Sequence, residues 1–434
     1  MTDKTRKTGQ TRRGVLKGLA AGGATLGAAQ ALPGWVPYIQ AQTAEPIRIG
    51  FQVHRTGIGA TYGRWYDRVT TAATRIINEG GGINGRPVEI VAEDDATDPK
   101  RGAEVVEKLA TQHNCDVAYG TLFSHVVIGS APRAAELELP YFVVSEGTHV
   151  ASGALNRWTL QPGITDVKAQ VLSMAPFITG ELGKKVTMIY PDYAFGYNHR
   201  DNLPDAIAAQ GGEVIEQIAI PPTETSFFKY FPRIPSDTEV IYHVMVGPAV
   251  LTFVKEMGDF YGSGDRPQVF GFIDSLEGVS IDAPGLDFLE GTYFWEGMPR
   301  YQQPDAAEWE TFYRDAVGVD GTGAATGDAD DVSTFGHMFG CWETLHVIKR
   351  GMEAANYQGP QDRKALVEAV EAIGEMAEGR EHPQGPKRFN GKTHQVFGPQ
   401  FISRVEEGRL TVVRETDIEA GMYEDMVDYT TRAF

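Results

Sequence analysis

The chain has 434 residues, with 58 acidic and 39 basic side chains and a formal net charge of −19. This length exceeds a single ordinary hydrophobic core and is typical of two domains of common size. The acidic balance excludes binding to nucleic acid or to anionic lipid through a basic surface.

The first 44 residues have the pattern of an export signal. Arg12 and Arg13 precede a weakly apolar, Ala/Gly-rich run at 18–31, which is typical of a twin-arginine (Tat) signal. The run is too short, and has too few large apolar side chains, for a membrane anchor. No cysteine follows it to carry a lipid, and two stretches of small residues offer cleavage positions. We therefore predict a Tat signal peptide and a mature N-terminal tail over 1–44, and a product that is free in the periplasm.

The first predicted elements are a strand and a helix. Residues 47–53 alternate in the manner of a strand, and a glycine-rich break follows at 56–59. A helix is predicted next, because apolar residues then recur at steps of three and four. The glycines at 80–82 supply the left-handed backbone that ends it.

A second strand is predicted at 88–91, and Asp98 with Pro99 marks the start of a second helix. This βαβα order predicts a parallel sheet. The pattern returns later, with a strand at 186–190, a helix at 197–209 and a strand at 213–219, and this similarity suggests two lobes of one architecture.

The remaining elements are predicted from the same signals. Strands are expected at 240–245, 269–272 and 291–295, and short strands after 397. Helices are expected at 306–317, 332–353 and 361–377, and loops at 223–237 and 319–331, which are rich in Pro, Gly, Thr and Asp.

The two cysteines, Cys115 and Cys341, allow one disulfide in an oxidising compartment. Because free cysteine is commonly buried as a small apolar residue, two unpaired thiols are favoured over a bridge.

Motifs for catalysis or cofactor binding fit this chain poorly. The glycines at 57, 59 and 63 suggest a dinucleotide-binding turn, but the third glycine is displaced and the acidic cluster at 93–95 comes too late. No Gly-x-Ser-x-Gly elbow, His-Glu-x-x-His or Cys-x-x-Cys motif occurs in the sequence. We therefore predict no enzyme, no cofactor and no metal site.

A series of landmarks resembles the binding proteins of ABC importers for branched-chain amino acids (the leucine/isoleucine/valine-binding protein family). The resemblance covers nearly the whole mature chain. The landmarks are Gly57 to Gly63, Gly80 to Arg86, Glu93 to Pro99, Gly120 to Ser124, Ser145 to Thr148, Asp192 to Gly196, Gly247-Pro248 and Gly385 to Phe389.

This resemblance implies an α/β fold, the type I periplasmic binding protein, with two Rossmann-like lobes that have parallel central sheets and are joined by a three-stranded hinge. The chain would cross between the lobes near Pro162, Trp295 and Arg380. We accordingly expect lobe 1 at 45–162 and 296–380, and lobe 2 at 163–295 and 381–434.

Ligand contacts are expected from loops at the carboxyl ends of strands, where hydroxyl groups and helix N-terminal amides converge. In the first lobe these are Ser124, Ser145, Gly147 and Thr148. The resemblance places the α-carboxylate and α-amino groups of an amino acid at these loops, with Ser124 and Thr148 on matching positions. The alternative role for each hydroxyl is helix capping.

Other ligand contacts are implied by the resemblance alone. Tyr62 matches an aromatic position of the first lobe. From the second lobe, Phe195 would close an apolar wall and Tyr197 would add a hydroxyl, while Val246 stands where an aromatic residue is common and would reshape that wall.

The acid that pairs with the ligand ammonium departs from the family pattern. It usually follows a strand-end glycine by two residues, whereas Asp274 follows Gly271 by three. Asp274 either reaches the ammonium or caps the following helix, and in the second case an aromatic acid or a small amide replaces the amino acid.

We therefore predict an extracytoplasmic receptor, and no enzyme, that captures a branched-chain or related amino acid by hinge closure and delivers it to a membrane permease. The receptor is expected to be a monomer and to bind no nucleic acid. Two alternatives remain: a ligand sensor with the same fold, and a Tat-exported oxidoreductase.

Overall fold

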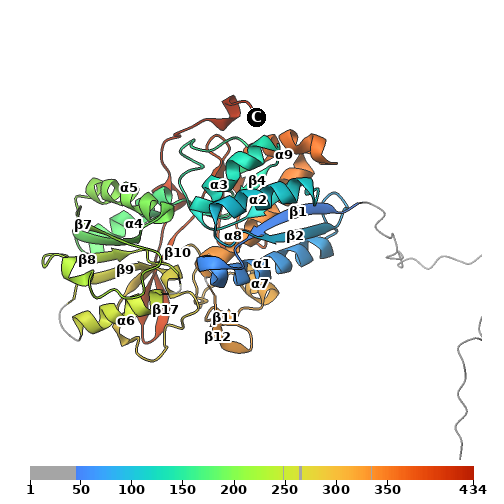
Figure 1. Cartoon of the computed structure of the whole chain (residues 1–434). Coiled ribbons are helices and arrows are strands. Elements are labelled where there is room, and N and C mark those ends of the chain that lie inside the picture. Colours follow the sequence, from blue (N-terminus) through green and yellow to red (C-terminus); the bar gives the residue numbers. More distant parts are fainter. Residues whose placement is uncertain (1–44, 248, 263–265, 334) are drawn as a thin grey trace, which may run out of the picture. The chain divides into compact units, whose positions relative to one another are not determined.

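The computed structural model describes residues 45–247, 249–262, 266–333 and 335–434 (Figure 1). The signal predicted over 1–44 lies outside these residues. No helix in the described ranges is both long and apolar enough to cross a membrane.

The first sheet is fully parallel and has the order β2-β1-β3-β4-β5. Its strands are β1 (Ile47–Val53), β2 (Val88–Asp94), β3 (Val117–Gly120), β4 (Tyr141–Val143) and β5 (Thr159–Leu160). Helices cover both faces, because the strands are apolar on both sides (Figure 1). One face is covered by α2 (Pro99–Thr111) and α3 (Ser124–Glu136), and the other by α1 (Ala60–Glu79), α7 (Glu308–Val317) and α8 (Phe335–Ala354), with α9 (Arg363–Glu371) packed on α8.

The second sheet has the order β17-β16-β10-β9-β8-β6-β7. Within it, the neighbouring strands β10, β9, β8, β6 and β7 are parallel to one another. The strands are β6 (Lys185–Pro191), β7 (Glu213–Ile220), β8 (Val240–His243), β9 (Gln268–Phe272), β10 (Tyr293–Glu296), β16 (Phe401–Glu406) and β17 (Arg409–Glu415). One face packs on α4 (Val167–Phe177) and α5 (Ala194–Ala209), the other on α6 (Val250–Tyr261). The two sheets share one local order. In the first sheet β1 lies between β2 and β3, and in the second sheet β6 lies between β7 and β8. The predicted repeat of one architecture is therefore present.

The helix end predicted at 80–82 is confirmed. Helix α1 ends at Glu79, and Gly81 and Gly82 have φ angles of 101° and 75°. A β-carbon on Gly82 would overlap the carbonyl of Arg86, so only glycine fits this turn.

Three elements differ from the sequence prediction. The predicted loop at 319–331 contains the hairpin β11 (Ala324–Ala325) and β12 (Asp328–Val332), so the following helix α8 begins at Phe335 and not at 332. Helix α4 was not predicted. The predicted helix at 361–377 ends at Glu371, because Met376 belongs to a third, antiparallel sheet of β13 (Glu375–Met376), β14 (Lys387–Asn390) and β15 (Gln395–Phe397).

The chain passes between the two large sheets after β5, after β10 and after β15. The third crossing is predicted near Arg380. In the structure, Phe389 and Val396 pack in the core of the first sheet, and the chain joins the second sheet only at β16. The exact lobe boundaries stay a prediction.

A buried ion pair lies beside the segments in which the chain crosses between the two large sheets. Lys387 on β14 contacts Glu343 on α8, and both side chains are 0% exposed. Lys387 Nζ also donates to the carbonyl of Gly163 at 2.6 Å. Gln384 donates from Nε2 to the carbonyls of Gly297 and Pro399, at 2.7 and 2.8 Å. All three crossings are thus tied to one polar cluster.

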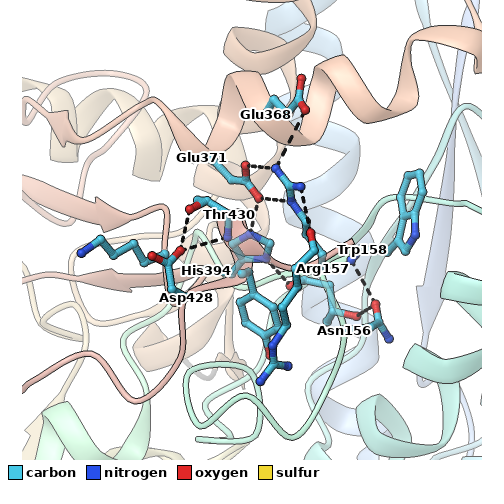
Figure 2. Close-up of polar contacts among 12 residues, drawn as sticks. Asn156, Arg157, Trp158, Glu368, Glu371, His394, Asp428 and Thr430 are labelled. Atoms are coloured by element: carbon cyan, nitrogen blue, oxygen red, sulfur yellow. Dashed lines mark hydrogen bonds and ion pairs between the residues drawn. The ribbon is translucent and has the colours of Figure 1, made fainter. Parts of the chain in front are cut away.

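In the C-terminal segment, Asp428 and Thr430 lie near His394, Glu371 and Arg157 (Figure 2). Near this segment, Arg157 forms a two-bond ion pair with Glu371, with both N···O distances 2.8 Å, and Glu371 also accepts from His394 Nε2 at 2.9 Å. Phe434 packs against Trp158 with the two rings tilted by 55° and their centroids 4.9 Å apart. Arg157 Nη1 also donates to the Arg432 carbonyl at 3.1 Å, so the segment is anchored by this hydrogen bond and by ring packing.

The two cysteines are free and buried. Cys115 packs among α2, α3 and their strands, whereas Cys341 lies in α8 within the core of the first sheet. Burial raises the pKa of Cys115 to about 12 and raises that of Cys341 as well. Both thiols therefore stay protonated at neutral pH.

Candidate functional site

A cavity with about 320 Å³ of unfilled space lies where the carboxyl ends of strands from both large sheets meet. The residues that line it are Tyr62, Leu122, Phe123, Ser124, Glu146, Tyr193, Phe195, Val246, Phe272 and His337. Most of them follow β1, β3, β4, β6 and β8 or end β9, which is where an open parallel sheet binds its ligands.

Aromatic rings form most of the wall. Tyr62 and Phe123 from the first sheet side meet edge to face, with centroids 6.1 Å apart. On the second sheet side, Phe195 lies 6.2 Å from Tyr193 and 5.8 Å from Phe272. Rings that contact one another hold their positions, so this wall suits a flat or branched apolar group.

Ser124 is the first residue of α3 and is 2% exposed. The N-cap position belongs to Phe123, so the Ser124 hydroxyl does not serve as the N-cap that was its alternative role. The Ser124 hydroxyl and the N-terminus of α3 together present hydrogen-bond donors to the cavity. Such donors favour the binding of an anionic group such as a carboxylate.

Four polar side chains, of which Glu146 and His337 line the cavity, form a connected group. His337 Nε2 lies 2.7 Å from Glu146 Oε1, and His337 Nδ1 contacts Asp274 Oδ2. Gln170 Nε2 donates to the same Glu146 oxygen at 2.7 Å. Glu146 follows β4 of the first sheet, Asp274 lies in a short helix after β9 of the second, and His337 is in the first turn of α8.

Asp274 does not line the cavity. Its carboxylate faces His337 and the backbone of Gly336, where an added β-carbon would lie 2.8 Å from Oδ1. Its carbonyl accepts a hydrogen bond of 3.1 Å from the Tyr62 hydroxyl. Burial, followed by the charge of Glu277, raises the pKa of Tyr62 well above its usual value, so this hydroxyl keeps its proton and donates.

The structure brings Tyr62, Ser124, Phe195 and Val246 together around one cavity. The other five predicted ligand residues lie outside its lining: besides Asp274, these are Ser145, Gly147, Thr148 and Tyr197.

Three of those residues shape the loop after β4. Ser145 is buried and its Oγ lies 3.5 Å from the Gly147 amide. Gly147 packs so closely on Ser124 that a β-carbon would lie 2.9 Å from its Oγ. The Thr148 amide donates to Asn198 Oδ1 of α5 at 3.1 Å, which joins the first sheet's loop to a helix of the second.

Tyr197 points elsewhere. Its hydroxyl donates to Asp192 Oδ1 at 2.8 Å in an exposed position. That hydrogen bond, together with burial and the charge of Asp192, raises the pKa of Tyr197. The binding role predicted for it stays a prediction.

Sequence reasoning missed six lining residues: Leu122, Phe123, Glu146, Tyr193, Phe272 and His337. Five of them stand inside or beside landmarks that were recognised, so strand-end position could have identified them. His337 carries no such signal, because it lies in a long helix whose contact with the cavity depends on tertiary packing alone.

No group of three or more His, Cys, Asp or Glu side chains in the described part of the chain is arranged to hold a metal ion.

Comparison with known proteins places the chain in a family. A model of the periplasmic binding protein family matches residues 46–409. Leu/Ile/Val-binding protein homolog 1 of Brucella suis is 24% identical over 286 residues, covering 62% of this chain and 72% of that protein. Leu/Ile/Val-binding protein BraC3 of Rhizobium johnstonii is 23% identical over 369 residues, covering 84% and 93%.

Solved structures agree on the fold. A solute-binding protein of an ABC transporter from Rhodopseudomonas palustris, in complex with 4-hydroxybenzoate, has a TM-score of 0.72 at 18% identity, covering 89% of this chain and 99% of that one. LivJ of Streptococcus pneumoniae, in complex with isoleucine, has a TM-score of 0.65 at 16% identity, covering 86% and 99%. With the two parallel sheets and the shared cavity between their strand ends, these matches show that the chain belongs to the periplasmic binding protein family, as a solute-binding protein of the branched-chain amino acid ABC transporter type.

Proposed function

We propose that this solute-binding protein captures a small carboxylate with an aromatic or branched apolar body and delivers it to the permease of an ABC importer. The observation that carries the proposal is the cavity itself: five aromatic rings surround it, and Ser124 with the first turn of α3 supplies donors at one side. Apolar walls with a few placed polar groups are the usual make-up of small-molecule sites.

Both ligands seen in the two solved relatives, 4-hydroxybenzoate and isoleucine, combine a carboxylate with an apolar body. This shared chemistry supports the class of solute. It includes the branched-chain amino acids expected from the sequence and the aromatic acids kept there as the alternative.

Capture would proceed by hinge closure. Tyr62 and Ser124 come from the first sheet side and Phe195 and Phe272 from the second, so one solute can touch both. A ligand favours closure only by its extra contacts in the closed state. We therefore propose that the aromatic rings contributed by both sides provide that difference, and that Ser124 fixes the carboxylate.

The site of action follows from the family, whose members work in the periplasm. The proposal also includes export by the Tat pathway and a monomeric state. It further includes delivery of the solute to a permease and not to a sensor partner. Pull-down of the mature protein with membrane proteins would separate transport from sensing.

The test is a thermal-shift screen of mature protein that has been unfolded and refolded to remove bound solute. The panel contains aliphatic and aromatic amino acids, benzoates, small amides and nicotinamide nucleotides. A ligand at 100 times its dissociation constant adds about 2.7 kcal/mol of stability. Stabilisation by carboxylates supports the proposal, whereas stabilisation by amides or nucleotides alone contradicts it.

A further inference from the structure

His337 stands between two acids that belong to different sheets. Its Nε2 lies 2.7 Å from Glu146, after β4, and its Nδ1 contacts Asp274, after β9. The histidine is 1% exposed and lines the cavity. One imidazole ring therefore occupies the space in which both carboxylates converge.

The position of the ring is fixed by its surroundings. Phe272 meets it edge to face, with centroids 5.1 Å apart. Gly336 leaves no room for a β-carbon beside Asp274, so the first turn of α8 sits directly against that acid. The imidazole is thus held between the acids by packing.

The titratable groups that face His337 come from three places: Glu146, Asp274 and His54. Burial lowers the pKa of His54 to about 4, against the raising effect of Asp95 and other acids, so His54 is neutral at neutral pH. Of these three groups, the two carboxyl groups are therefore the ones that can pair with His337 by charge.

An imidazole resembles an ammonium group in one respect: it can present N–H to acceptor oxygens, from one ring nitrogen when neutral and from both when protonated. In this cavity those atoms are directed at Glu146 and Asp274. The His337 ring therefore occupies the space beside both carboxylates that a ligand ammonium would need. A buried ammonium without a carboxylate of its own is strongly unfavourable.

We propose that His337 is the specificity-determining residue of this pocket, and that it takes the place of a ligand ammonium, so the pocket accepts carboxylates that lack an α-amino group. This inference rests on the proposed capture of carboxylates and narrows the class of ligand to carboxylates without an α-amino group. Asp274 then serves His337 and does not contact the ligand.

The test uses pairs of ligands that differ only in the α-ammonium: phenylalanine with 3-phenylpropanoate, and leucine with 4-methylpentanoate. Calorimetry on refolded protein at neutral pH gives the ratio of the two dissociation constants within each pair. In the native protein the deaminated member should bind at least about tenfold more tightly, which is about 1.4 kcal/mol.

His337→Ala frees both acids and should shift this ratio toward the amino acid by about tenfold or more. Adding Asp274→Asn to that variant should reverse most of the shift. The matched control is His113→Ala, a half-buried histidine that pairs with Glu93 away from the cavity and should leave the ratio unchanged. Circular dichroism checks that each variant is folded.

If His337→Ala does not fold, Asp274→Asn alone decides. Our proposal predicts that it does not weaken either member of a pair selectively, whereas a selective loss of amino acid affinity makes Asp274 the ammonium partner and overturns the inference. Tighter binding of amino acids by the native protein also overturns it while keeping carboxylate capture. If none of the four ligands binds and the benzoates of the thermal-shift panel do not bind either, the proposed function and the inference are overturned together.

Discussion

Ser124 is the residue whose removal tests the carboxylate site most directly. Ser124→Ala removes a hydrogen bond to a charged group, which is worth about 1.5 to 3 kcal/mol, so the dissociation constant should rise by about tenfold to a hundredfold. Calorimetry with any bound carboxylate measures this, and Ser152→Ala on an exposed turn is the control. An unchanged affinity would remove Ser124 from the site.

Glu277 should make stability depend on pH. Burial raises its pKa from 4.5 to about 8, although the nearby charges of Arg300 and Arg64 lower it. A carboxyl group that holds its proton more tightly when folded stabilises the protein fully below its unfolded pKa, and this stability is lost as pH rises through the folded value.

The free energy of unfolding should therefore fall between about pH 4.5 and 8, and the fall should be smaller in Glu277→Gln. Urea titrations at several pH values compare the two proteins. Parallel pH profiles of the native protein and the variant would contradict this account of Glu277.

Among the elements, the three crossings depend on the buried pair of Glu343 and Lys387. Glu343→Gln leaves the Lys387 ammonium without a carboxylate and should cost about 3 to 5 kcal/mol of stability. Replacing both residues, as Glu343→Leu with Lys387→Met, should cost less, because no charge remains buried. Urea unfolding of Glu343→Leu, Lys387→Met and the double variant measures the coupling, and additive losses would show that the two side chains act independently.

Elements with strong local signals could be predicted from the sequence, and those that depend on tertiary contacts could not. The helix end at Gly81 and Gly82 and the strand at 47–53 follow from backbone and alternation rules. Helix α4 had a usable signal, since Asp166 caps it by accepting from the Ala169 amide. The bend between Glu371 and Met376 had none, because it forms by pairing with β14.

The same division holds for the site. Tyr62, Ser124, Phe195 and Val246 were found from strand-end positions and the family resemblance, and the structure gathers them around one cavity. His337 lies more than sixty residues beyond the nearest other lining residue, Phe272. Only the packing of α8 against the first sheet brings it there, so no local pattern could have indicated it.

At the scale of the whole molecule, the bond from the Thr148 amide to Asn198 joins the two sides of the cavity. Asn198→Ala removes one hydrogen bond that forms only when the sides meet, so ligand release should quicken by about twofold to tenfold while association stays the same. Stopped-flow fluorescence measures both rates, with Asp201→Ala on the same helix as the control. A change confined to the association rate would show that the Asn198 hydrogen bond does not stabilise the closed state.

The buried state of Cys115 and Cys341 has a practical consequence for observing such motion. Because neither thiol is exposed or ionised, a maleimide dye should react only with cysteines introduced at the surface. Two dyes placed on either side of the cavity would report opening and closing of single molecules in an otherwise native background, without first removing a natural cysteine.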